Sequence, residues 1–157
     1  METVQGDLIK LAKSGAFDVI AHGCNCMCSM GAGIAAKIKD VFPEAYKADI
    51  NTTKGDKSKL GTCSFAVVDT AEGPLTVVNA YTQFKPGGTG VIVDYDAVRK
   101  CMRWIKAHYG GRRIGLPRIG AGLAGGDWKR IRKIIRRELK GEDVTVVEYE
   151  PLGGQGY

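Results

Sequence analysis

The sequence contains no apolar run of the ~20 residues that a membrane-spanning helix requires. Its first residues also lack the order of basic and then apolar residues that marks a secretory signal peptide. These two absences argue against an integral membrane protein and against a secreted one. We therefore expect an intracellular, cytoplasmic protein that makes no membrane contact.

Patterns typical of metal sites and disulfide frameworks are also missing. The chain has five cysteines, an odd number, and only two histidines. Cys24, Cys26 and Cys28 alternate instead of forming the CxxC pairs typical of zinc sites. Cys63 and Cys101 are remote from them in sequence. We expect small buried thiols in a reducing compartment, with neither a metal nor another cofactor.

The two common nucleotide-binding motifs are absent. No GxxxxGK[ST] segment occurs, and the segment from Gly31 to Ala36 matches GxGxxG only imperfectly, with alanine at its last position. No acidic ribose ligand follows on a suitable strand. A Rossmann domain usually places its glycine turn after the first strand, where this chain has Asp7. The glycine-rich turns therefore need another explanation.

What is present is the composition of one globular domain. The chain has 157 residues, 44% of them hydrophobic and 25% charged, so it can bury a core and is not generally disordered. We expect a single monomeric domain over residues 1–150 and a flexible tail over 151–157. The net charge is +6 and the isoelectric point is near 9.1, which indicates attraction to polyanions.

Much of this charge lies in residues 128–140. The apolar residues of this segment recur at helical spacing: Ile131, Ile134, Ile135 and Leu139. The spacing predicts an amphipathic helix whose outer face carries the cations Lys129, Arg130, Arg132, Lys133, Arg136, Arg137 and Lys140. Two interpretations of this face stay open, because it can simply be solvated or can contact nucleic acid weakly through phosphates.

Strand-like and helix-like segments alternate along the chain. Strands are predicted at 2–5, 18–21, 62–69, 75–81, 113–116 and 144–149, with helices between most of them and a polar loop at 51–59. This alternation predicts an α/β fold with three layers, α/β/α, around a mixed and largely parallel central sheet.

Two glycine-rich loops follow predicted strands and lead into helices. The first contains Gly31-Ala32-Gly33, and the second spans 120–126. Unpaired N–H groups at a helix start attract anions, and glycine lets the backbone approach a ligand closely. Ligands of α/β folds bind beyond the carboxyl ends of the strands, so we expect the two loops to converge. The first loop is predicted to cradle a diphosphate, with the Asn25 amide above it.

These residues together resemble the macro domain family, whose members bind ADP-ribose. The likeness covers almost the whole chain, from Gly6-Asp7-Leu8 to the last predicted strand. It implies that Asp7 contacts the adenine amino group, with the Leu8 backbone beside it. It also implies that Asn25, at the end of His22-Gly23-Cys24-Asn25, contacts the distal ribose. The family's two phosphate loops correspond to Gly31, Ala32, Gly33 and Ile34, and to Gly120, Ala121, Gly122, Leu123 and Ala124.

Within the family, His-x-Cys-Asn-Cys before Gly-x-Gly-Ile is similar to the branch of ADP-ribose 1''-phosphate phosphatases and terminal ADP-ribose glycohydrolases. Glycohydrolases of this branch carry a catalytic aspartate directly after the second loop, where this chain has Ala124. Other family hydrolases carry an aspartate after the first loop, where this chain has Ala35. Both familiar carboxylates are therefore missing, and Asp127 is more typical of a helix N-cap.

The phosphatases of this branch use a histidine at the position of His22 together with an aspartate from a later loop. Imidazole titrates near neutral pH and can act as a proton donor or a nucleophile. Asp94 and Asp96, at the start of the helix before the predicted strand at 113–116, are the candidate partners. Asp94 can equally cap that helix, and His22 can equally be a buried histidine bonded to backbone.

The resemblance thus implies ADP-ribose or ADP-ribose 1''-phosphate as the ligand. We expect a phosphatase that hydrolyses ADP-ribose 1''-phosphate to ADP-ribose and phosphate. Two alternatives stay open: a non-catalytic ADP-ribose-binding module, and a hydrolase that removes ADP-ribose from protein or nucleic acid. Tyr149 can pack on the nucleotide or belong to the core. Arg118 can meet a phosphate or form a surface ion pair.

Overall fold

The structure is a computed structural model that describes residues 1–149, so the predicted tail at 151–157 lies outside the described residues. In chain order the elements are β1 (Glu2–Gln5), α1 (Leu8–Lys13), β2 (Val19–Asn25), α2 (Gly33–Val41), α3 (Pro43–Ile50), the 3-10 turn η1 (Lys57–Lys59), β3 (Cys63–Thr70), β4 (Gly73–Gln83), α4 (Tyr95–Tyr109), β5 (Arg113–Leu116), α5 (Trp128–Glu138) and β6 (Asp143–Glu148).

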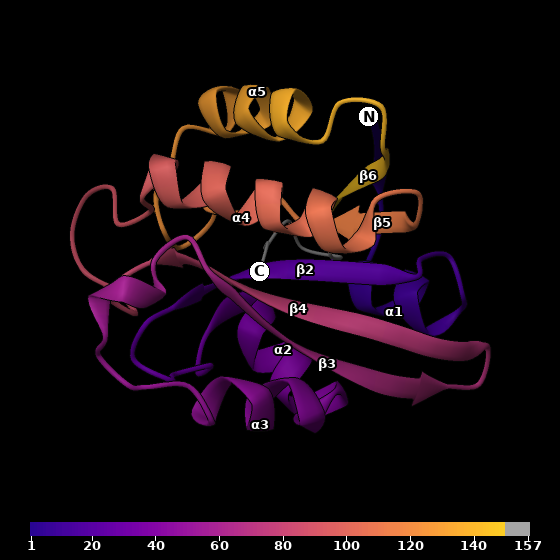
Figure 1. The fold of residues 1–157 in the computed structure, drawn as a ribbon, viewed down its shortest axis with the longest axis horizontal. Coiled ribbons are helices and arrows are strands. Elements are labelled where there is room, and N and C mark those ends of the chain that lie inside the picture. The colour runs from indigo at the N-terminus through magenta and orange to yellow at the C-terminus, as the bar shows by residue number, and fades with distance from the viewer. Residues whose placement is uncertain (150–157) are drawn as a thin grey trace.

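The strands form one sheet in the order β1-β6-β5-β2-β4-β3. Every neighbouring pair is parallel except β3, which runs antiparallel to β4. Helices α4 and α5 cover one face of the sheet, and α2 and α3 cover the other (Figure 1). The predicted α/β/α architecture with a mixed, largely parallel sheet is therefore confirmed.

Strand β2 divides the hydrophobic core into two halves. Val19 and Ala21 pack among the buried residues of α4 and α5, whereas Ile20 packs among those of α1, α2 and α3. Successive side chains of a strand point to opposite faces, so a strand covered on both faces is apolar without alternation. No helix of residues 1–149 has the length and apolar character needed to cross a membrane.

Strand β2 is longer than the sequence pattern predicts. The predicted strand ends at residue 21, but β2 continues to Asn25 because residues 22–24 pair in parallel with residues 79–81 of β4. The register shifts between Cys24 and Asn25, where the chain leaves the sheet. Residues 22–25, which were expected to form a turn, therefore belong to a central strand. Asn25 is at the carboxyl end of that strand, where the turn begins.

The polar loop at 51–59 is held by a buried lysine. Lys59 ends η1 and is 7% exposed, and its Nζ donates to the carbonyl of Cys26 at 3.2 Å. The Gly55 N–H donates to the same carbonyl at 2.7 Å. These two bonds fasten the loop to the segment that connects β2 with α2.

Candidate functional site

A cavity of about 340 Å³, which we call the cleft, opens at the carboxyl ends of the parallel strands β2, β4, β5 and β6. The two glycine loops that follow β2 and β5 form much of its wall. The predicted ligand-binding residues in this wall are Asn25, residues 31–34, residues 120–124 and Tyr149. The structure thus brings both glycine loops and the end of β6 to one cavity.

The first glycine loop ends in a helix start that has no side-chain cap. The N-cap of α2 is Ala32, which has an extended backbone and makes no side-chain hydrogen bond, and Gly33 has a φ of +59°. By contrast, an aspartate accepts hydrogen bonds from the first N–H groups of α1, α4 and α5. The first N–H groups of α2 therefore lack a side-chain acceptor and lie in the cleft wall, at the positive end of the helix dipole.

The second glycine loop has a backbone shape that glycine alone fits. Gly120 has a φ of +72°, and a Cβ there would lie 2.7 Å from Val93 Cγ2. The carbonyl of Ala124 accepts from the N–H groups of Ile92 and Val93 at 2.9 and 3.3 Å. The segment before α4 therefore braces this loop. Leu123 stands at its tip with 67% of its surface exposed.

The Asn25 side chain shapes the turn that follows β2. Its Nδ2 donates to the carbonyl of Ser29 at 2.8 Å, and its Oδ1 accepts from the Met27 N–H at 2.9 Å. Cys28, inside this turn, has a φ of +53°, and no other non-glycine in residues 1–149 has a positive φ. An amide has two hydrogens and two oxygen lone pairs. Asn25 can therefore hold the turn and still offer one donor and one acceptor to a ligand.

His22 lies outside the described cleft wall and points toward α3. Its ring is fully buried, and Nε2 is 2.7 Å from Asn79 Oδ1. Asn79 Nδ2 donates to the Ala45 carbonyl and to Ser64 Oγ, so its oxygen accepts and the histidine Nε2–H donates. Burial lowers the pKa of His22 from 6.5 to about 4, which keeps the ring neutral at neutral pH. These contacts are structural, and a catalytic role stays a prediction.

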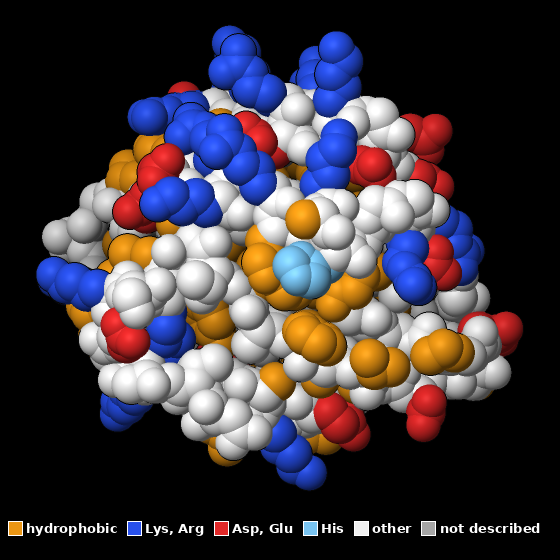
Figure 2. Space-filling model, in the orientation of Figure 1, with side chains coloured by type: hydrophobic (Ala, Val, Ile, Leu, Met, Phe, Trp, Pro, Cys, Tyr) orange, Lys and Arg blue, Asp and Glu red, His pale blue; other side chains and the backbone are white. Residues whose placement is uncertain are grey.

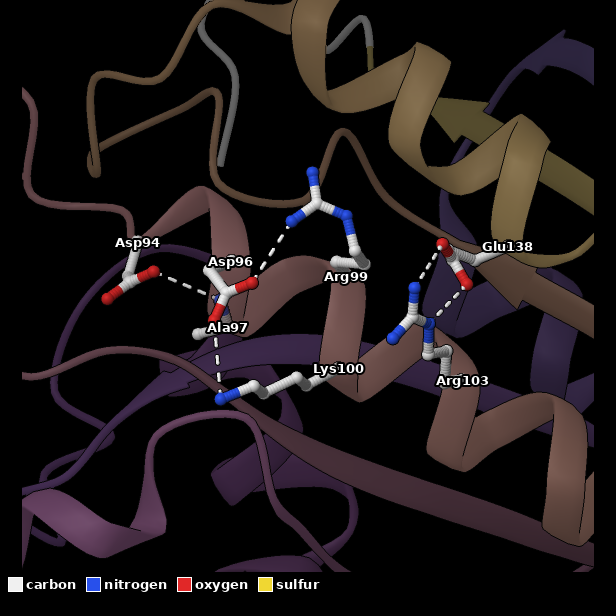
Figure 3. A network of polar contacts seen from close by, with 7 residues as sticks. All are labelled: Asp94, Asp96, Ala97, Arg99, Lys100, Arg103 and Glu138. Carbon is white, nitrogen blue, oxygen red and sulfur yellow. Dashed lines mark hydrogen bonds and ion pairs between the residues drawn. The ribbon is translucent and has the colours of Figure 1, made fainter.

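The two predicted carboxylate partners of the histidine lie on the outside of α4 (Figure 3). Asp94 is the N-cap of this helix, and its Oδ1 accepts from the Ala97 N–H at 3.0 Å. Asp96 forms ion pairs with Arg99 at 3.0 Å and Lys100 at 3.3 Å, and the bond from Lys100 is the main reason that its pKa is lowered. Neither residue belongs to the described cleft wall, so the structure does not gather the predicted catalytic group there.

Asp7 and Leu8 lie at the end of β1, beside the strand end that carries Tyr149. Asp7 caps α1, where its Oδ1 accepts from the N–H groups of Ile9 and Lys10 at 3.0 and 3.2 Å. The Leu8 side chain is buried in the core. Both residues are at the same edge of the sheet as the cleft, although the described wall includes neither, whereas half-buried Tyr149 lines it.

Two polar residues of the wall were missed or left undecided by the sequence pattern. Gln83 lines the cleft because β4 runs two residues beyond the predicted strand, in parallel with β2. Arg118 lines the cleft after β5, and its Nε also lies 3.7 Å from Glu148 Oε1. In the part of the wall that the structure describes, Arg118 is the one cation, and no carboxylate or imidazole is found. The wall offers backbone donors, amides and one guanidinium.

A profile of the macro domain family matches residues 21–135. The chain belongs to the macro domain family. The resemblance indicated by the glycine loops is thereby confirmed. Over nearly its whole length, the macro domain is 34% identical to an uncharacterized 17.5 kDa protein in the tk-vs intergenic region of Enterobacteria phage T4, with 95% of this chain and 96% of that protein covered.

Two further relatives have names that state an activity. The ADP-ribose glycohydrolase OARD1 of Homo sapiens is 25% identical over 149 residues, which cover 93% of this chain and 88% of that protein. An ADP-ribose 1''-phosphate phosphatase of Meyerozyma guilliermondii is 45% identical over 51 residues, which cover 32% of this chain and 29% of that protein.

Solved structures share the fold of this macro domain. A Bacteroides thetaiotaomicron protein of unknown function superposes with a TM-score of 0.73 at 31% identity, covering 94% of this chain and 96% of that one. Thermosipho africanus DarTG, solved in complex with ADP-ribose, superposes with a TM-score of 0.71 at 19% identity, covering 99% of this chain and 43% of that one. At that identity the second comparison establishes the common fold alone.

Proposed function

We propose that the cleft of this macro domain binds ADP-ribose, with the diphosphate held between the two glycine loops. The observation that carries the proposal is the uncapped start of α2, which shares one cavity with the second glycine loop. Unpaired N–H groups at a helix start can hold phosphates without a charged side chain. The names of OARD1 and the fungal phosphatase, and the DarTG complex with ADP-ribose, support this choice of ligand.

The order of the strands suggests how the ligand lies. Tyr149, after β6, and Asp7, after β1, are on one side of the loop that follows β5, and we assign the adenosine to that side. Asn25 and Gln83, the last residues of β2 and β4, are on the other side, and we assign the distal ribose to their amides. The diphosphate then lies at the middle of the cleft, where the backbone donors are.

Isothermal titration calorimetry with ADP-ribose tests the proposal. We expect one binding site, and weaker binding of AMP, which lacks the second phosphate and the distal ribose. The variant Gly31→Val adds a side chain in the cleft wall. A Cβ at Gly31 would meet Ser29 Oγ alone, at 4.0 Å, so the fold tolerates the change. Because valine narrows the cleft, we expect ADP-ribose to bind at least about tenfold more weakly.

The matched control is Gly87→Val. Gly87 is outside the described cleft wall, and a Cβ there would meet no atom within 4 Å. We expect this variant to bind ADP-ribose like the wild type, and both variants to keep the wild-type melting temperature. The proposal fails if the wild type does not bind ADP-ribose, or if both valine variants lose binding equally.

A second candidate function is hydrolysis of ADP-ribose 1''-phosphate to ADP-ribose and phosphate. The observation that favours it is the 45% identity to a phosphatase of that name over 51 residues. Hydrolysis of the phosphate monoester needs a proton for the leaving oxygen and a positioned nucleophile. His22 adjoins Gly23 of the cleft wall, so the imidazole would have to leave Asn79 and turn toward the cleft to act.

Phosphate release from ADP-ribose 1''-phosphate tests this second function. The wild type is expected to release phosphate, and His22→Gln is expected to release none while still binding ADP-ribose. Absence of release by a wild type that binds ADP-ribose would leave a binding module. Release of ADP-ribose from a modified protein or nucleic acid would instead support a glycohydrolase, despite Ala35 and Ala124.

A further inference from the structure

Helix α5 concentrates the charge of the molecule on one exposed surface. Residues 127–140 contain seven cations and two acids, a net charge of +5 in a chain whose total is +6. At 3.6 residues per turn, five cations of α5 fall within an arc of about 120°, and Lys140 follows two residues after the helix ends. All six are exposed, and we call them the cationic face: Lys129, Arg130, Lys133, Arg136, Arg137 and Lys140. Lys and Arg side chains gather along the upper edge of the molecule, over α4 and α5 (Figure 2).

Three cations of the neighbouring helix α4, Arg99, Lys100 and Arg103, pair with carboxylates, whereas those of the cationic face do not in the described part of the chain. Asp96 pairs with Arg99 and Lys100, and Glu138 binds Arg103 through two hydrogen bonds of 2.8 and 3.3 Å (Figure 3). No carboxylate of residues 1–149 forms an ion pair with a member of the cationic face. Like charges four residues apart on a helix repel one another, so an anionic partner would relieve this arrangement.

The buried side of α5 argues against a lipid surface as that partner. A helix that inserts into a membrane interface needs a free apolar face. The apolar residues of α5, Ile131, Ile134 and Ile135, are already buried against the core. The exposed large hydrophobic residues in the described part of the chain all lie on other segments. A helix that lies flat on the protein and presents cations alone fits the phosphate backbone of a nucleic acid.

The cationic face begins at the rim of the cleft. Arg118 lines the cleft, and its guanidinium lies 5.3 Å from the ring of Trp128, the first residue of α5. From there the helix extends over roughly 16 Å. A nucleic acid strand bound along α5 can therefore place the nucleotide beyond Trp128 in the cleft. A cavity of about 340 Å³ admits a single nucleotide-sized unit, and a single strand presents one without the unstacking and unpairing that a duplex requires.

We propose that the cationic face of α5 binds the phosphate backbone of single-stranded nucleic acid, with the strand directed toward the cleft. The contact should be independent of sequence, because exposed cations meet phosphates, and phosphate contacts carry no sequence information. It is also independent of the ADP-ribose proposal, since it is measured without that ligand.

Fluorescence anisotropy with a labelled single-stranded DNA of roughly 16 nucleotides tests the proposal. Affinity should fall steeply as salt rises from about 50 to 200 mM. In the variant Lys133→Ala/Arg136→Ala/Arg137→Ala we expect at least about tenfold weaker binding and a log–log salt slope reduced by about two. Alanine favours the helix and all three positions are exposed, so the fold should be retained. An unchanged melting temperature of this variant would verify that retention.

The matched control is Lys10→Ala/Lys13→Ala/Lys47→Ala, which removes three exposed lysines from α1 and α3 on the opposite face of the sheet. Its DNA affinity should equal that of the wild type. Three results would overturn the proposal. The first is that no DNA binds at low salt. The second is that the α5 variant and the control variant lose DNA affinity equally. The third is that the wild type binds the duplex of the same sequence more tightly and loses this preference in the α5 variant. Binding to phosphatidylserine vesicles that depends on α5, without binding to DNA, would likewise refute it in favour of a membrane.

Discussion

His22 connects three elements through a single amide. Its Nε2–H donates to Asn79 on β4, and Asn79 in turn donates to the Ala45 carbonyl on α3. A neutral imidazole satisfies this network. A protonated one would carry a charge in a fully buried position, which is why burial lowers the pKa of His22 to about 4. The same burial makes the stability of the fold depend on pH.

We predict that the free energy of unfolding falls as the pH is lowered from 6.5 toward 4. The pKa of His22 is about 4 in the folded state and 6.5 when the residue is unperturbed, so the unfolded state binds the proton first. Neutral His22 makes its full contribution to the free energy of unfolding above pH 6.5. About 3 kcal/mol of that free energy is lost when the pH reaches 4. Urea unfolding at neutral pH and near pH 5 measures the change.

The control for this prediction is His22→Gln. Glutamine keeps an N–H for Asn79 Oδ1 and does not titrate, so the pH dependence between these two conditions should be smaller in the variant. Equal pH dependence in both proteins would contradict the prediction, because other groups would then account for the whole effect.

At this scale the sequence predicts backbone roles better than side-chain contacts. Gly120 could be assigned to a phosphate loop because its motif reflects a local backbone conformation, and the structure gives it a positive φ. The contacts of His22 could not be predicted, because Asn79 lies 57 positions away. Which side chains meet there depends on the parallel register of β2 and β4, which no local pattern encodes.

The N-caps show which helix starts are already bonded to a carboxylate and which can bind a ligand. Asp7, Asp94 and Asp127 cap α1, α4 and α5. Helices α2 and α3 begin without a side-chain cap, and of these two only α2 begins in the described cleft wall. A capped helix start has already used its first donors. Asp94, which the sequence offered as a catalytic candidate, and Asp127, which it assigned to an N-cap, therefore both hold helix starts.

We predict that Asp94→Ala lowers the free energy of unfolding by about 1 kcal/mol and that Asp94→Ser lowers it much less, because serine is also a good N-cap. Both variants remove the carboxylate, so they separate its capping role from any role in phosphate release. Urea unfolding of the three proteins measures the stability. Equal stability of the alanine and serine variants would contradict a capping role, and loss of phosphate release in both would support a catalytic one.

Strands whose ends follow from the local sequence pattern are predicted at their observed bounds. Strands whose ends depend on pairing with a neighbouring strand are not. Residues 2–5 and 113–116 form β1 and β5 as predicted. Strand β2 extends beyond its predicted end because residues 22–24 pair with residues 79–81 of β4, and β4 extends because Gln83 pairs with Asn25. That extension carries Gln83 to the cleft, which is why the sequence did not reveal this residue.

Over the whole molecule, the ligand loops lie at one end of a buried central sheet. Strand β2 lies between β5 and β4, and its two faces are covered by the two halves of the core. The glycine loops are joined to the carboxyl ends of β2 and β5 and surround the cleft. Amides at the centre should exchange through global unfolding alone, whereas those of the loops should exchange through local opening.

We predict that ADP-ribose slows amide hydrogen exchange in both glycine loops together. Residues 31–35 and 120–124 are far apart in sequence but line one cleft, so a diphosphate bound between them should accept from both backbones and restrict both loops. The edge strand β3 and the outer face of α5 lie outside the described wall and should be unaffected. Exchange followed by mass spectrometry, with and without saturating ADP-ribose, measures this. Protection of one loop alone would show that the two loops do not share the diphosphate, even where calorimetry detects binding.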